Sequence, residues 1–302
     1  MPFSKNDLNH SIPDLTGKTA LVTGGNKGLG YESVLQMADN GAKVILACRD
    51  VKQGQAAKAS IMAQVPQAAI EVMALNLTHA QSIQSFCDSF KQKHESLDIL
   101  LLNAGVVNLE QHQLTHSGQE MHMATNHLGH FALTGQLFDV LLNSKKPRVV
   151  TVSSLAYKAG VINFEDFNWH NRSYDRFKAY GDSKLANLLF MMGLQKRFDK
   201  AGVNGISLSA HPGLTATERQ QTIGIGGALA HWIASPVKKG SRSQLLAATG
   251  AGVKANQFYG PKFVLLGKPK ALTLKSKFLN EAMANKLWEY SEAETGVSFS
   301  GG

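Results

Sequence analysis

The sequence predicts an α/β protein built on a doubly wound parallel sheet, and two observations support this fold class. Short apolar runs alternate with longer helical patterns as far as about residue 215. Runs such as DILLLN (98–103) and RVVTVS (148–153) are apolar at consecutive positions, which is typical of parallel strands buried on both faces. In such a sheet, ligands bind at the carboxyl ends of the strands.

The alternation sets the order of the expected elements. Strands are expected at 19–24, 42–49, 70–76, 97–105, 148–154 and 205–210, with a short last strand at 257–261. Helices are expected at 29–40, 51–64, 80–93, 117–143 and 179–200, with a final helix at 280–291. Between the sixth strand and residue 239 the pattern becomes irregular and glycine-rich. We interpret 214–239 either as a substrate-covering segment or as an ordinary surface loop.

Composition narrows the class of protein. The 302 residues are 43% hydrophobic, which suits one large domain over 1–302. Only Cys48 and Cys87 are present, so no disulfide framework is expected. The first residues contain no apolar signal-peptide core, and the weakly polar stretch 223–234 is too short to span a bilayer. We therefore expect a cytoplasmic protein without stable membrane insertion.

The formal charge of +9 is concentrated near the C-terminus. Nine Lys or Arg residues and no Asp or Glu lie between His231 and Lys277. A solvated basic face is the favoured interpretation, and a nucleic-acid or membrane patch is the alternative. Aromatic side chains do not interleave with these lysines in an ordered way, so we expect no nucleic-acid partner.

The stretch TALVTGGNKGLGYE (19–32) turns sharply after a strand. Its glycines at 24, 25, 28 and 30 lie between the first expected strand and the first expected helix. Glycines allow a backbone to approach a pyrophosphate, and a helix N-terminus favours an anion. A glycine-rich turn alone is a weak signal, but this position in the first βαβ unit predicts a dinucleotide site.

Five further motifs accompany the turn pattern TGxxxGxG. They are NAG at 103–105, NHLGHF at 126–131, Ser153-Ser154, YGDSK at 180–184 and HPG at 211–213. In this order they resemble the short-chain dehydrogenase/reductase family, over about residues 17–217. NHLGHF, SSLAY, the 26-residue spacing from Ser154 to Tyr180 and YGDSKLANLLF are most similar to the retinol dehydrogenase and protochlorophyllide reductase branch.

The resemblance implies a single-domain Rossmann fold with a seven-stranded parallel sheet in the order 3-2-1-4-5-6-7. It also assigns a set of residues to the dinucleotide. The expected cofactor-binding residues are Thr23, Gly24, Asn26, Lys27, Gly28, Leu29, Gly30, Arg49, Asn76, Leu77, Asn103, Ala104, Gly105, Tyr180, Lys184, Pro212, Gly213 and Thr215.

Charges at the turn and at the end of the second strand favour NADP, used as NADPH, over NAD. Lys27 lies inside the turn and Arg49 ends the second strand, where both could meet a ribose 2′-phosphate. Asp50 is the competing residue: it would accept from an NAD ribose, but we interpret it as a helix N-cap. Asn76 departs from the family's frequent aspartate, yet its amide can still hydrogen-bond adenine.

Four residues are expected to carry the chemistry. Tyr180 and Lys184 share one helix face; a phenol with a pKa of about 10 becomes a useful acid/base when an ammonium is nearby. Ser154 is expected to hydrogen-bond the reacting oxygen, because strand alternation points Ser153 the other way. Asn126 is expected to hold a relay water, to satisfy a bent helix, or both.

The sequence therefore predicts hydride transfer between a nicotinamide and a carbonyl or alcohol carbon of a small substrate. Reduction of a carbon–carbon double bond, as in protochlorophyllide reduction, is the alternative, and a non-catalytic NADP-sensing protein is a second. Phe164, Phe167, Trp169 and Trp232 suggest an apolar or aromatic substrate. The resemblance also implies a possible homodimer or homotetramer.

No metal site is expected. Histidines recur at 112, 116, 122, 127 and 130, but no HExxH or CxxC motif accompanies them. We interpret His127 and His130 as packing residues beside Asn126, and His211 as a turn residue.

Overall fold

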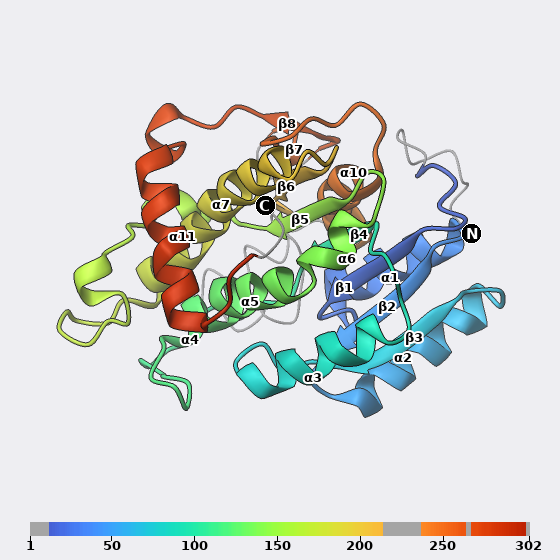
Figure 1. Cartoon of the computed structure of the whole chain (residues 1–302), viewed down its shortest axis with the longest axis horizontal. Coiled ribbons are helices and arrows are strands. Elements are labelled where there is room, and N and C mark those ends of the chain that lie inside the picture. The colour runs from blue at the N-terminus through green and yellow to red at the C-terminus, as the bar shows by residue number, and fades with distance from the viewer. Residues whose placement is uncertain (1–11, 214–236, 264–266, 300–302) are drawn as a thin grey trace.

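A computed structural model describes residues 12–213, 237–263 and 267–299, and its strands form one central sheet between helices (Figure 1). The segment 214–236, which holds the expected residues Thr215 and Trp232 and most of the expected covering segment, lies outside the described residues. The strands are β1 (Thr19–Thr23), β2 (Lys43–Cys48), β3 (Ile70–Ala74), β4 (Ile99–Leu102), β5 (Arg148–Val152), β6 (Ile206–Ala210), β7 (Phe258–Pro261) and β8 (Pro269–Leu272).

The sheet order is β3-β2-β1-β4-β5-β6-β7-β8. The pairs from β3 to β7 are parallel, which confirms the expected order 3-2-1-4-5-6-7. The expected count of seven was one short, because β8 adds an antiparallel strand beside β7. Its sequence PKAL is partly exposed at the sheet edge, and a short edge strand with Pro and Lys carries no apolar signature.

Alternate side chains of β1, β2, β4 and β5 enter two different cores, which makes the fold doubly wound. Ala20 and Val22 of β1 enter the core formed with α1, α2 and α10, whereas Leu21 enters the core formed with α3, α5 and α7. The helices of the first face are α1 (Gly28–Asp39), α2 (Val51–Gln64) and α10 (Arg242–Thr249). Those of the second face include α3 (Ala80–Lys91), α5 (Gly129–Gln136), α6 (Phe138–Leu142) and α7 (Arg176–Lys200).

The remaining helices are short or lie outside these layers. They are α4 (Met121–Met123), a π-helix (Ala124–Leu128), α9 (Val237–Gly240), α11 (Glu281–Thr295) and the 3₁₀ turns Leu155–Ala159, Phe164–Asp166 and Ser276–Phe278. In Figure 1, α11 lies across α7 and α5. Within the described ranges, no helix is both long and apolar enough to span a bilayer.

The single helix expected over 117–143 is wrong. The chain there forms α4, the π-helix, α5 and α6 in succession. The π-helix widens the turn around Asn126, and such turns are frequent at functional sites. Period-3.6 patterning cannot distinguish a π-turn inside a helical run from a regular helix, because the apolar positions shift by only one residue.

Candidate active site

The predicted motifs converge on one edge of the sheet. β1, β4, β5 and β6 end at Thr23, Leu102, Val152 and Ala210, and a motif follows each of them. Because these neighbouring strands are parallel, their carboxyl ends lie side by side.

The glycine-rich turn has the backbone that a dinucleotide requires. Gly24 and Gly28 have left-handed φ values of +66° and +57°, which favour glycine. A Cβ on Gly30 would lie 2.2 Å from the Gly24 carbonyl oxygen, whereas a Cβ on Gly28 would meet no atom within 4 Å. The turn is therefore closed against the protein at Gly30 and open at Gly28, beside the N-terminus of α1. These features fit a bound pyrophosphate.

Thr23 and Asn103 join this turn to the NAG segment. The fully buried hydroxyl of Thr23 accepts from the backbone N–H groups of Asn103 and Ala104, both at 2.9 Å. The Asn103 side chain donates to the Thr23 carbonyl oxygen at 2.9 Å. Both side chains therefore brace the two loops, while Ala104 lies against Gly24.

Gln244 of α10 is a bracing residue that sequence reasoning missed. It is 1% exposed, and its Nε2 lies 2.8 Å from Ser33 Oγ and 3.2 Å from Asn103 Oδ1. It also lies 3.4 Å from the Leu29 carbonyl oxygen. The available signal in the sequence was a glutamine directly before the apolar run LLAA (245–248). Its hydrogen-bond partners, however, are remote in sequence.

Two oppositely charged residues, Arg49 and Asp50, follow β2 directly. Asp50 caps α2, accepting from Gln53 N and Gln53 Nε2, both at 3.1 Å. This confirms the N-cap interpretation. Asn26 Nδ2 donates to Gln53 Oε1 at 3.1 Å, which links the glycine turn to α2. Arg49 and Lys27 have exposed side chains.

Asn76 follows β3 and forms a local turn. Its Oδ1 accepts from Thr78 N at 3.2 Å and from Thr78 Oγ1 at 2.9 Å. The next residue, Leu77, is buried. Its carbonyl oxygen lies so close to Gly129 that a Cβ on Gly129 would be only 2.2 Å from this oxygen. Because Thr78 uses the side-chain oxygen of Asn76, the amide nitrogen is the group of that side chain that is left for a further partner.

The expected catalytic groups lie around the end of β5. Ser153 Oγ donates to the Lys184 carbonyl oxygen at 2.8 Å and is buried, whereas Ser154 is partly exposed and its hydroxyl accepts from Ala156 N at 3.3 Å. The strand thus points the two serines in different directions, as expected. Lys184 is 5% exposed; its Nζ lies 3.0 Å from the Val152 carbonyl oxygen and 5.4 Å from the centroid of the Tyr180 ring.

Asn126 is completely buried in the π-helix. Its Oδ1 accepts from Val106 N at 2.8 Å, and its Nδ2 donates to the Val106 carbonyl oxygen at 3.1 Å and to Ser183 Oγ at 2.9 Å. A Cβ on Gly105 would lie 2.8 Å from Asn126 Oδ1 and 3.7 Å from Lys184 Nζ. Asn126 and Lys184 therefore meet at Gly105, and the amide supports the bent helix.

Two histidines beside Asn126 have packing roles. His130 contacts Thr23 Oγ1 and the Asn126 carbonyl oxygen at 2.9 and 3.0 Å, and His127 contacts Ser291 Oγ at 2.9 Å. Burial lowers the pKa of His127 to about 3 and that of His130 to about 4, so both rings are neutral at pH 7. Among the described residues, no three His, Cys, Asp or Glu side chains gather as a metal site.

The HPG segment follows β6. His211 is buried against Phe258, its Nδ1 accepts from Gly213 N at 3.1 Å, and burial lowers its pKa to about 4. Gly213 has a φ of +74°, and Pro212 and Gly213 are partly exposed. His211 is therefore a turn residue, as expected.

The aromatic side chains expected to indicate the substrate pack within the protein. Phe164 and Phe167 lie 5.7 and 4.2 Å from the ring of Tyr290. Trp169 is 4% exposed and stacks under the Arg172 guanidinium at 3.5 Å. These contacts explain the three rings structurally, so they do not indicate an aromatic substrate.

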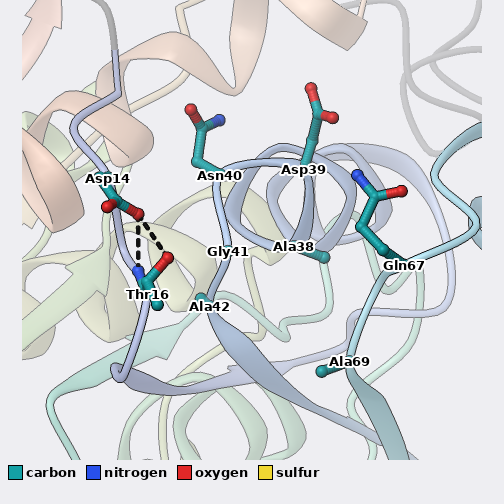
Figure 2. A pocket seen from close by; sticks show the side chains of 9 residues that line it. All are labelled: Asp14, Thr16, Ala38, Asp39, Asn40, Gly41, Ala42, Gln67 and Ala69. Carbon is teal, nitrogen blue, oxygen red and sulfur yellow. Dashed lines mark hydrogen bonds between the residues drawn. The ribbon is translucent and has the colours of Figure 1, made fainter.

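A cavity of about 370 Å³ lies at the opposite edge of the sheet (Figure 2). Its lining comes from the residues just before β1, from the end of α1 and the α1–β2 connection, and from the residues just before β3. Asp14 accepts there from Thr16 N and Thr16 Oγ1 at 2.9 and 2.6 Å. None of the predicted site residues lines this cavity.

Known proteins resemble the chain across most of its length. Residues 18–226 match the family described as short chain dehydrogenase. Retinol dehydrogenase 13 of Homo sapiens is 40% identical over 70% of this chain, which spans 63% of that relative's length. Retinol dehydrogenase 14 of Mus musculus is 35% identical and covers 93% of this chain and 86% of its own length. The short-chain dehydrogenase TIC 32 B, chloroplastic, of Brassica napus is 34% identical, covering 94% and 90%.

Solved structures show the same architecture. An uncharacterized protein from Mycobacterium paratuberculosis superposes with a TM-score of 0.82 and 36% identity, covering 98% of each chain. A short chain dehydrogenase of Shigella flexneri, in complex with NADP, has a TM-score of 0.63 at 21% identity, covering 82% of this chain and 98% of its own. The chain belongs to the short-chain dehydrogenase/reductase family, in its retinol dehydrogenase-like branch, whose members are oxidoreductases that bind nicotinamide cofactors.

Proposed function

We propose that this protein is an NADP-dependent oxidoreductase, one domain over 1–302, that exchanges hydride with a carbonyl or alcohol carbon of a small apolar substrate. The observation that carries the proposal is the placement of Ser154, Tyr180 and Lys184 around the end of β5, at the sheet edge where the open glycine turn lies.

The chain has features that suit both phosphate groups of NADP, the central pyrophosphate and the 2′-phosphate on the adenosine ribose. The turn at Gly28 and the N-terminus of α1 face the pyrophosphate position. Arg49 and Lys27 are exposed cations near the ribose position, and Asp50 is committed to capping α2. This arrangement favours a 2′-phosphate over a 2′-hydroxyl. The NADP in the Shigella flexneri structure agrees with that preference.

When bound, the nicotinamide would supply or accept the hydride. Tyr180 would exchange a proton with the substrate oxygen, and Ser154 would hydrogen-bond that oxygen. Lys184 would favour the phenolate form of Tyr180 through its charge and hydrogen-bond the ribose. Asn126 would connect Lys184 to a proton route through a water. The NAG segment, Pro212 and Gly213 would border the nicotinamide half, and Thr215, which lies outside the described residues, stays a predicted contact.

Two alternatives use the same residues. Reduction of a carbon–carbon double bond needs the same hydride and proton donors and differs only in the substrate. A non-catalytic NADP sensor would need no acid/base residue, and the presence of both Tyr180 and Lys184 disfavours it. The apolar substrate and the homodimer or homotetramer stay predictions. The cytoplasmic location also stays a prediction, since one relative is chloroplastic by name.

The first experiment compares binding of NADPH and NADH by calorimetry and then follows oxidation of NADPH with apolar aldehydes, ketones and quinones. We expect tighter binding of NADPH and turnover of at least one compound. Tyr180→Phe should bind NADPH as the wild type does and lose turnover by a factor of 100 or more, on the order expected for a lost general acid. Near-normal turnover in this variant would refute the acid/base role. Tight NADPH binding without turnover on any compound would support the sensor.

A further inference from the structure

A buried polar cluster beside Tyr180 is used by none of the steps above. His122 and Glu120 are 0% and 1% exposed. His122 Nδ1 lies 2.9 Å from Glu120 Oε1, and the Tyr174 hydroxyl lies 3.3 Å from the same nitrogen. The three side chains come from α4, from the residue before it and from the loop that precedes α7.

The backbone around Glu120 fixes the cluster. Glu120 Oε2 accepts from Met123 N at 2.8 Å, which caps α4, and Glu120 N donates to Asn168 Oδ1 at 3.0 Å. Asn168 and Tyr174 both belong to the segment 160–174, which precedes α7. The cluster therefore ties that loop to the helical segment that carries Asn126.

Within the described part of the chain, the hydrogen bonds leave one nitrogen of the imidazole without a partner. Both carboxylate oxygens of Glu120 are engaged, one by His122 Nδ1 and the other by Met123 N. His122 Nε2 is buried and has no hydrogen-bond partner among the described residues. A buried carboxylate and an unpaired ring nitrogen both reduce stability relative to apolar residues. The cluster is therefore not explained by a contribution to the stability of the fold.

The contact between the rings of His122 and Tyr180 gives the cluster a role in the proposed active site. Their ring centroids are 5.9 Å apart at an interplanar angle of 62°, an edge-to-face arrangement. The helix α7 fixes only the backbone of Tyr180, whereas packing must fix its side-chain rotamer. Glu120 Oε1 at 2.9 Å and the Tyr174 hydroxyl at 3.3 Å both lie against Nδ1 and oppose rotation of the His122 ring away from Tyr180.

We propose that His122, held by Glu120 and Tyr174, is a positioning residue that fixes the ring of Tyr180 for proton transfer. The inference rests on the proposed function of Tyr180. It also makes the loop at 160–174 a support of the proton donor, because Tyr174 and Asn168 hold the other side of the cluster.

The test uses His122→Asn in the full chain. Asparagine places Nδ2 as many bonds from Cα as histidine places Nδ1, so a donor to Glu120 is kept while the ring contact is lost. We expect kcat to fall about tenfold or more, because a small displacement of a reacting group is costly. KM and the Kd for NADPH should stay within about twofold of the wild-type values.

His127→Asn is the matched control. It removes an equally buried imidazole from the same helical segment, whose ring contacts Phe131 and Phe190 instead of Tyr180. We expect kcat to stay within about twofold, whatever the change in Tm. An equal loss of kcat in the two variants, or an unchanged kcat in His122→Asn, would overturn the proposal. If His122→Asn does not fold, Tyr174→Phe replaces it: the ring stacked on His112 remains, and kcat should fall without a change in the Kd for NADPH.

A second measurement needs no turnover. Ring flipping of Tyr180 is followed by NMR with labelled tyrosine, and its signal is assigned by its loss in Tyr180→Phe. We expect faster flipping in His122→Asn than in the wild type and no change in His127→Asn. If the wild type turns over no compound, the proposed function fails and this comparison alone decides: faster flipping supports the positioning role, and unchanged flipping refutes it.

Discussion

Arg49 and Asp50 are neighbours with opposite charges, and the hydrogen bonds of Asp50 distinguish it from Arg49. The Asp50 carboxylate accepts both Gln53 N and Gln53 Nε2, so a ribose hydroxyl would have to compete with a helix cap. Arg49 is exposed at the end of β2. The sequence favoured the N-cap for Asp50 without fixing it, because an N-cap and a ribose acceptor can both be an aspartate at this position.

Arg49→Ala tests this separation directly. We expect the Kd for NADPH to rise roughly 10- to 100-fold, as for the loss of a charge-assisted hydrogen bond to phosphate, while the Kd for NADH changes little. Calorimetry with both cofactors gives the comparison. Lys52→Ala removes another exposed cation three residues further along and should leave both constants near the wild-type values. Equal losses for the two cofactors in Arg49→Ala would refute a phosphate contact.

At the scale of elements, strand positions were predictable and long-range braces were not. β1 and β6 end within one residue of the expected positions, where Gly24 and His211 interrupt the apolar runs. β4 and β5 end earlier than expected, at Leu102 and Val152 instead of 105 and 154. Gln244 and Glu120 could not be assigned in this way. Gln244 contacts Asn103 and Glu120 contacts Asn168, and packing between separate elements brings these partners together, which no local pattern records.

The contact between the 160–174 loop and α7 predicts a dependence of stability on pH. Asp182 of α7 accepts from Val161 N at 2.8 Å and pairs with Arg172 at 3.2 Å. Burial nevertheless raises its pKa to about 6. An aspartate whose folded pKa exceeds its unfolded value, about 3.9, holds its proton more tightly when folded. Its ionisation between pH 4 and 6 therefore lowers stability, and the loss is complete above about pH 6.

Asp182→Asn cannot ionise and should escape this loss. Relative to the wild type, its free energy of unfolding should rise by up to about 3 kcal/mol between pH 4 and pH 7, measured by urea denaturation at several pH values. Asp98→Asn is the control of opposite sign. Burial opposes ionisation of Asp98, but hydrogen bonds from Thr19 N, Lys18 and Ser144 hold its pKa below the usual range. That variant should lose stability relative to the wild type as the pH rises, and parallel trends in the two variants would contradict the argument.

At the scale of the whole molecule, α11 completes the second core. Trp288 lies 4.9 Å from the ring of Phe131 on α5 and 5.7 Å from that of Phe190 on α7. Gly193 makes room for it, since a Cβ there would lie 2.5 Å from the indole. The C-terminal helix therefore covers the faces of α5 and α7 (Figure 1). Any homodimer would have to use a surface that α11 leaves free, or α11 itself.

Trp288→Ala should therefore lower the free energy of unfolding of the whole domain, because it removes packing from the second core and not only from the C-terminal helix. The indole is 2% exposed and also contacts Phe299 at 4.5 Å and the Arg197 guanidinium at 3.7 Å. Removing a buried aromatic side chain costs about 3–5 kcal/mol, to be measured as the loss in the free energy of unfolding in urea. Phe177→Ala removes a ring that is 56% exposed and should cost less than about 1 kcal/mol. A Trp288→Ala protein as stable as Phe177→Ala would mean that the cores on the sheet do not depend on α11.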